Sequence, residues 1–166
     1  MSVEIRPARP SDLDALLALE EVSFPGDRIS RRSYRRLIGR PTALILVAES
    51  EDEITGSCTV LLRQNSRQAR LYSIAAAKAG SGLGRALLAA AEKAAALRGF
   101  RSMRLEVRQD NRRAVSFYEK SGYKRIGFRP DYYSDGMAAL RFEKYLDVHC
   151  GDCADQVNIS GSVQPC

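Results

Sequence analysis

The fold is decided by the stretch LYSIAAAKAGSGLGRALL, residues 71–88 of this 166-residue chain. Its apolar start belongs to a segment, Arg70–Ala76, whose residue pattern predicts a strand. A glycine-rich turn follows, Gly80-Ser81-Gly82-Leu83-Gly84-Arg85, and then a long alanine- and leucine-rich helix, Leu83–Arg98. Glycines allow the backbone to approach a ligand closely, and the free N–H groups at a helix start point toward anionic oxygens. The turn therefore predicts either an anion-binding loop or a tight helix–sheet connection.

Two common nucleotide-binding loops do not match this turn. The Walker pattern requires Gly-Lys-Ser/Thr, whereas Gly84-Arg85-Ala86 provides no hydroxyl for a magnesium ion. The Rossmann pattern places its glycines directly after the first strand of a parallel unit, but here several predicted strands precede them. Both nucleotide-binding interpretations are therefore disfavoured.

The elements on either side of this unit predict an α+β fold with a mixed, mostly antiparallel central sheet flanked by helices. The first strand is expected at Val3–Arg6. The first helix is expected to begin near Pro10, with Ser11 as its N-cap and with Glu20 facing away from its apolar residues. Further helices are expected at Ser30–Gly39 and Asn111–Ser121, and further strands at Ala43–Glu49, Ile54–Arg63, Met103–Val107, Tyr123–Arg129 and Ala138–Tyr145.

The C-terminal stretch, residues 147–166, is polar and has no periodicity, so residues 1–146 are predicted to form the domain and the rest an irregular tail. The tail contains four candidate zinc ligands, His149, Cys150, Cys153 and Cys166. An adjacent His and Cys chelate awkwardly, and a single CxxC is a weak signal, so no metal site is predicted. Cys58 lies in an apolar run and is interpreted as a small buried hydrophobe.

Three polar residues beyond the glycine turn are candidates for chemistry. Glu106 alternates with the apolar Leu105 and Val107, so it is expected on the opposite face of its strand. Asn111 stands where a helix N-cap is wanted. Tyr118 lies one helical turn after Ala114, where an aromatic residue commonly belongs to the core. Spacing alone favours the structural role for each of the three.

Several motifs in the right order resemble the GNAT superfamily of N-acetyltransferases, and in particular the bacterial ribosomal-protein N-terminal alanine acetyltransferases. The resemblance extends from about Val3 to Leu146. The motifs that carry it are Gly82-Leu83-Gly84-Arg85-Ala86-Leu87-Leu88, Leu105-Glu106-Val107-Arg108, Asp110-Asn111-Arg112-Arg113-Ala114, Phe117-Tyr118-Glu119-Lys120-Ser121-Gly122-Tyr123 and Pro130-Asp131-Tyr132-Tyr133-Ser134-Asp135-Gly136.

This resemblance implies an enzyme that moves the acetyl group of acetyl-CoA to a primary amine, most closely a protein N-terminal α-amine. It implies that Glu106 is the general base and Tyr118 the general acid. The residues implied in binding the cofactor are a splayed strand (Ile74, Ala75 and Ala76), a pyrophosphate loop (Gly80, Ser81, Gly82, Leu83, Gly84 and Arg85) and Asn111.

One feature departs from the family pattern. The family has Gln or Arg at the first position of the glycine motif, whereas this chain has Ala79, and the loop between Ile74 and Gly82 is about two residues short. This departure keeps open a catalytically degenerate acyl-CoA-binding module. A small-molecule amine or a lysine side chain remains the alternative acceptor.

The net charge of +6 is concentrated in Arg28–Arg40, which carries six arginines. A solvated helix face is the favoured interpretation of this segment, and a polyanionic partner is the alternative. No aromatic residues are interleaved for base stacking, so nucleic acid is disfavoured. No apolar run approaches the roughly 20 residues of a membrane span, and the N-terminus has no signal-peptide core. We therefore expect a cytoplasmic protein, a monomer or homodimer, without a membrane partner.

Overall fold

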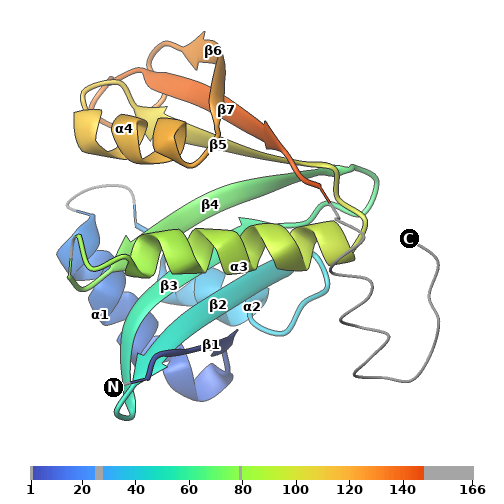
Figure 1. Ribbon diagram of the computed structural model, residues 1–166. Helices are drawn as coiled ribbons and strands as arrows, with labels where there is room; N and C mark the ends of the chain where they lie inside the picture. Colours follow the sequence, from blue (N-terminus) through green and yellow to red (C-terminus); the bar gives the residue numbers. More distant parts are fainter. Residues whose placement is uncertain (1, 25–27, 79, 148–166) are drawn as a thin grey trace.

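A computed structural model describes residues 2–24, 28–78 and 80–147. It confirms the α+β fold and its mixed sheet (Figure 1). The elements in chain order are β1 (Glu4–Pro7), η1 (Pro10–Asp12), α1 (Leu13–Ser23), α2 (Arg31–Leu37), β2 (Ala43–Ser50), β3 (Glu53–Leu61), β4 (Gln68–Ala76), α3 (Leu83–Leu97), β5 (Ser102–Arg108), α4 (Arg112–Lys120), β6 (Lys124–Arg129) and β7 (Ala139–Tyr145). Ala79 and the tail with its candidate zinc ligands lie outside the described residues.

The sheet has the strand order β1-β2-β3-β4-β5-β7-β6, and β4 with β5 is its parallel pair. β1 to β4 form the expected antiparallel meander. Both faces of this half are covered, because side chains of β2 alternate between two cores. Leu44 and Leu46 pack in the core beneath α3, while Ile45 and Val47 pack in the core that α1 and α2 cover. No helix in the described part of the chain is long and apolar enough to cross a membrane.

The parallel pair separates soon after it begins. Its register contains Gln68 with Ser102, Ala69 with Met103 and Arg70 with Arg104, and no later pair. Figure 1 shows β4 and β5 together at the right of the view and diverging toward the left. A β-bulge assists the divergence, since Thr59 pairs with Ser73 and Val60 with Leu71, which leaves Tyr72 as the extra residue of β4. The second half of β4 therefore has a sheet partner on its β3 side and none on its β5 side.

The start of the first helix differs from the prediction. Ser11 is not the N-cap, because it lies inside a turn of 3-10 helix that precedes α1, and the Asp12 side chain bonds back to the residue before that turn. Asp12 Oδ2 accepts a hydrogen bond from the Arg9 backbone N–H at 2.7 Å, and the two carboxylate oxygens of Asp12 accept from the Arg6 guanidinium at 2.9 and 3.0 Å. The hydrogen bonds from Arg6 hold the pKa of Asp12 below its usual value.

The expectation that Glu20 faces away from the core is wrong, because its side chain is buried. Glu20 Oε1 accepts hydrogen bonds from the Tyr34 hydroxyl at 2.9 Å and from the Ser73 hydroxyl at 2.8 Å. Glu20 Oε2 accepts from the Ile29 backbone N–H at 3.1 Å. Burial, followed by the charge of Glu20, raises the pKa of Tyr34. One carboxylate thus joins α1, the start of α2 and the bulged part of β4.

Candidate active site

The glycine turn after β4 has the backbone of an anion-binding loop. Gly80 and Gly82 have φ angles of 78° and 82°, a left-handed region that glycine adopts without strain. Gly82 is the N-cap of α3, and a Cβ added to it would meet no heavy atom within 4 Å. Glycine is therefore needed at Gly82 for its backbone conformation, and the space beside it stays open.

Positive groups converge on this turn. The first intrahelical bond of α3 runs from the Ala86 N–H to the Gly82 carbonyl at 3.1 Å, so the preceding N–H groups have no helical acceptor. Arg85 is exposed at the same helix start. Arg113, on α4, lies close as well, because its Nη2 is 4.0 Å from the position of a Cβ on Gly80. The sequence analysis missed Arg113, although its place just after Asn111 was a usable signal. Together these groups suit a diphosphate.

The glycine turn is held against the sheet by close packing of α3. A Cβ on Gly56 of β3 would lie 2.9 Å from side-chain atoms of both Leu83 and Leu87. A side chain there would require both leucine side chains to shift, so Gly56 allows the start of α3 to pack closely on β3. The neighbouring segment Ile74–Ala76 is paired to β3 through Cys58, Ser57 and Gly56, so its other backbone edge faces the space where β5 has diverged.

Glu106 lies on β5 with its side chain on the face opposite Leu105 and Val107, as predicted. Its side chain is 11% exposed, and Arg70 Nε lies 3.2 Å from Glu106 Oε2. Arg141, directly across the β5–β7 pair, has its Nε 3.9 Å from Glu106 Oε1.

The two arginines that share the Glu106 face of β5, Arg104 and Arg108, pair with other carboxylates. Arg104 Nε instead contacts Glu143 Oε2 at 2.7 Å. Arg108 contacts both Asp110 at 3.2 Å and Asp135 at 2.7 Å. The partners of Glu106 come from β4 and β7, since side chains that share a face across neighbouring strands lie closer than alternate residues of one strand.

Arg70 connects Glu106 to the β6–β7 loop. Besides its contact with Glu106, Arg70 donates a hydrogen bond from Nη2 to the Tyr132 hydroxyl at 2.5 Å. Partial burial and the negative charge of Glu106 raise the pKa of Tyr132. Sequence spacing could not find this cluster, because Arg70 and Tyr132 are separated by 62 positions.

Tyr118 is a buried residue of α4, packed edge-to-face against Phe117 and Tyr123 with ring centroids 5.1 and 5.7 Å away. Burial is the main cause of its raised pKa, and Cys58 and Tyr133 add smaller electrostatic contributions. Its hydroxyl thus lies within electrostatic range of β3 and of the β6–β7 loop. Cys58 is itself buried, as predicted, and burial raises the pKa of its thiol to about 12.

Asn111 is the N-cap of α4, since its Oδ1 accepts a hydrogen bond from the Ala114 N–H at 3.1 Å. This confirms the structural role that spacing favoured. A contact of Asn111 with a cofactor stays a prediction, as do the catalytic roles of Glu106 and Tyr118.

The glycine turn, the free edge of β4 and Glu106 therefore surround the divergence of β4 and β5. The Glu106 side chain is on the face of β5 opposite the core that contains Tyr118.

Comparisons with known proteins agree with this geometry. The family model of the GNAT acetyltransferase domain matches residues 14–146. A Bacillus subtilis protein, provisionally named a ribosomal protein bS18-alanine N-acetyltransferase, is 29% identical over 131 residues, which cover 79% of this chain and 87% of that protein.

Solved structures share the fold. The ribosomal-protein-S18-alanine N-acetyltransferase of Escherichia coli superposes with a TM-score of 0.79 at 23% identity, covering 89% of this chain and 96% of that one. The PaiA N-acetyltransferase of Thermoplasma acidophilum, solved with coenzyme A, gives 0.73 at 23% identity, with 87% and 99% covered. Acetyl-CoA is the co-substrate of this family. The matched domain, the splayed parallel strands and the glycine turn together show that the chain belongs to the GNAT acetyltransferase family.

Proposed function

We propose that this protein transfers the acetyl group of acetyl-CoA directly to a protein N-terminal α-amine, with both substrates bound at once. The observation that carries the proposal is the divergence of β4 and β5. The glycine turn lies at the end of β4, and the Glu106 carboxylate lies on β5. The relatives named for ribosomal protein S18 favour a protein N-terminus as the acceptor.

Acetyl-CoA, when bound, supplies the acetyl group as a thioester. The residues fit this co-substrate. The N–H groups at Gly82–Arg85, with the guanidinium groups of Arg85 and Arg113, provide the charge and donors for its diphosphate. The free edge of Ile74–Ala76 provides backbone groups for the amides of the pantetheine arm, and Asn111 at the start of α4 is an additional contact.

Glu106 is proposed to take the proton of the acceptor amine. An α-amine has a pKa near 8, so at neutral pH most of it must lose a proton before its nitrogen can attack. A carboxylate can accept that proton directly or through one water. Before the acceptor binds, Arg70 and Arg141 contact the Glu106 carboxylate from the two strands beside β5.

Tyr118 is proposed to hold a proton at its phenolic oxygen for the leaving sulfur. Its raised pKa keeps the phenol protonated throughout the neutral range, so it is available as a donor at every working pH. The backbone N–H groups of the unpaired β4 edge near Ala75 and Ala76 are proposed to stabilise negative charge on the acetyl oxygen.

The acceptor class distinguishes this proposal from its alternatives. We would measure CoA release with three amine sets: peptides with a free α-amine, the same peptides with a blocked N-terminus and an internal lysine, and small-molecule amines. The proposal predicts turnover on the free α-amine and its loss in Glu106→Gln. Turnover confined to lysine or to small amines would show that the acceptor is that amine and not a protein N-terminus. Cofactor binding with no turnover on any amine would indicate the degenerate module.

A further inference from the structure

The face of the sheet around Glu106 carries more positive than negative charge. Arg70 and Arg141 both contact Glu106. Arg129, on the neighbouring edge strand, is exposed and close enough to Tyr132 to lower its pKa electrostatically, as Arg70 also does. Two guanidinium groups thus contact the Glu106 carboxylate, and a third acts on Tyr132 beside it.

The other arginines of this face are already neutralised. Arg104 is paired with Glu143, and Arg108 with Asp110 and Asp135. The excess positive charge is therefore local to Glu106. In the proposed function, the acceptor amine binds at this place.

We infer that Arg70 selects acceptors that carry a carboxylate close to the reacting amine, such as an N-terminus with an acidic second residue or a free amino acid. This inference rests on the proposed function and narrows its substrate class. It follows from what a bare ammonium group would meet at Glu106: two guanidinium groups repel it, and its attraction to Glu106 competes with an existing ion pair.

An acceptor that carries both an ammonium and a carboxylate resolves this competition. Its carboxylate takes the place of Glu106 on Arg70, and its ammonium takes the place of Arg70 on Glu106, so both side chains stay paired. An acceptor with the ammonium alone breaks the Arg70–Glu106 contact and leaves the Arg70 guanidinium without an anion. A second cation near the amine adds repulsion to that loss.

Arg70 is the arginine best placed for the exchange. Its side chain is 42% exposed, against 27% for Arg141, so an incoming group can reach it. Its Nε and Nη2 contact Glu106 and Tyr132, while Nη1 has no hydrogen-bond partner among the described residues. The hydrogen bond to Tyr132 orients the guanidinium plane and favours a carboxylate approaching in that plane.

The test uses acceptors that differ only in charge. One set is a peptide with Glu, Gln or Lys as its second residue; the other is alanine against alaninamide. The kcat/KM ratio of the Glu to the Gln peptide is expected to be about tenfold in the wild type, with the Lys peptide poorest. The preference should decrease with added salt, because Arg70 is partly exposed.

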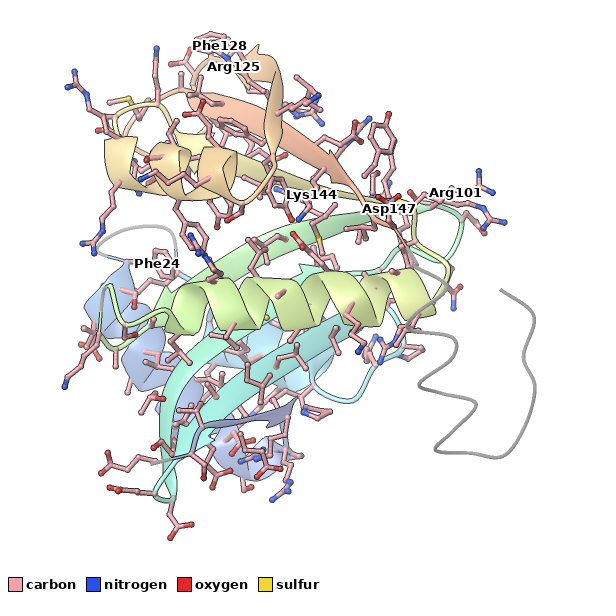
Figure 2. All side chains as sticks on the ribbon, in the orientation of Figure 1. Phe24, Arg101, Arg125, Phe128, Lys144 and Asp147 are labelled. Carbon is pink, nitrogen blue, oxygen red and sulfur yellow. The ribbon has the colours of Figure 1, made fainter. Side chains whose placement is uncertain are left out.

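Variants test whether Arg70 causes the preference for the Glu peptide. Arg70→Gln should reduce the Glu:Gln ratio to below about twofold, and Arg70→Lys should retain part of it because the charge remains. Arg125→Gln is the matched control: it removes the same charge from β6, but Arg125 pairs with Phe142 and so points to the other face of the sheet. Figure 2 shows Arg125 at the top edge of the molecule, away from α3.

The outcomes separate this inference from the function on which it rests. A Glu:Gln ratio near one, a preference for the Lys peptide, or an equal loss in Arg125→Gln would overturn it. If alanine is preferred over alaninamide while no peptide reacts, the carboxylate preference holds and the protein N-terminus is the wrong acceptor. If wild-type protein acetylates none of these amines, the proposed function fails and the inference with it.

Discussion

Glu106 and Tyr118 belong to opposite faces of β5: the Glu106 side chain shares its face with Arg70 and Arg141, while Tyr118 packs in the core with Leu105 and Val107. To serve one reaction, they would have to act at the place where β4 and β5 lose their pairing. The bulge at Tyr72 lies in β4 just beyond the last residue paired with β5. An amine entering from the Glu106 face and a thioester held on the α3 side would meet between the strands.

Tyr118→Phe tests the acid side of this arrangement. We expect turnover to fall by about 10²–10⁴-fold, with acetyl-CoA affinity nearly unchanged. Tyr123→Phe is a matched control, since Tyr123 is a buried neighbour whose hydroxyl donates to Glu92 at 2.7 Å instead. It should lower the unfolding midpoint and leave turnover alone. Wild-type turnover in Tyr118→Phe, with chemistry rate-limiting, would make Tyr118 a core aromatic only.

Gly82→Ala tests the glycine turn. The left-handed φ of Gly82 strains any other residue by about 1–2 kcal/mol, although a Cβ would clash with nothing. Calorimetry should show weaker acetyl-CoA binding together with a modest loss of stability. Gly39→Ala provides the control, because Gly39 has φ of 80° and equally free space at the C-terminal end of the second helix. Equal affinities in the two variants would contradict the placement of the diphosphate.

Glu20→Ala tests the buried carboxylate that joins α1, α2 and β4. It leaves the Tyr34 hydroxyl, the Ser73 hydroxyl and the Ile29 N–H without their acceptor. We expect the free energy of unfolding to fall by about 3 kcal/mol or more, measured by urea denaturation. The neighbouring Glu21→Ala, on an exposed position, should change it by less than about 0.5 kcal/mol. Similar losses of unfolding free energy in both variants would show that Glu20 does not anchor these elements.

Asp12 makes stability depend on pH. Its folded-state pKa is depressed, chiefly by the hydrogen bonds from Arg6, so its contribution is present above the ordinary value of about 4. The contribution is lost as the pH falls through the lowered folded-state value. Unfolding curves of wild type and Asp12→Asn should therefore differ at pH 6 and converge toward pH 2. A constant difference across that range would assign the effect to something other than this carboxylate.

The fold was predictable where the signal is local. Apolar runs and alternation located the strands, and the glycine turn located the centre of the sheet. Asn111 caps α4 as expected, and α2 begins directly after Ser30. The start of the first helix was misjudged because Asp12 is held by Arg6, a contact that residue order does not reveal. Glu20 was misjudged for a similar reason, since its burial depends on donors from α2 and β4.

In the candidate site, too, local features could be predicted and tertiary contacts could not. The direction of Glu106 followed from alternation along β5, but its partners Arg70, Arg141 and Tyr132 come from three distant segments. They meet because β4 and β5 are adjacent before they separate and because the β6–β7 loop returns to the same face. Pairing of this kind is set by tertiary structure, so residue spacing could not reveal these partners.

The role of Glu106 as the base is the central claim, and a pH–rate profile on an N-terminal peptide tests it most directly. Glu106→Gln should keep the fold and bind acetyl-CoA normally, yet acetylate about 10²-fold or more slowly at neutral pH. The deficit should shrink as the pH rises above 8, where the amine is already neutral without help. Profiles of wild type and Glu106→Gln that overlap across the whole range would contradict the account.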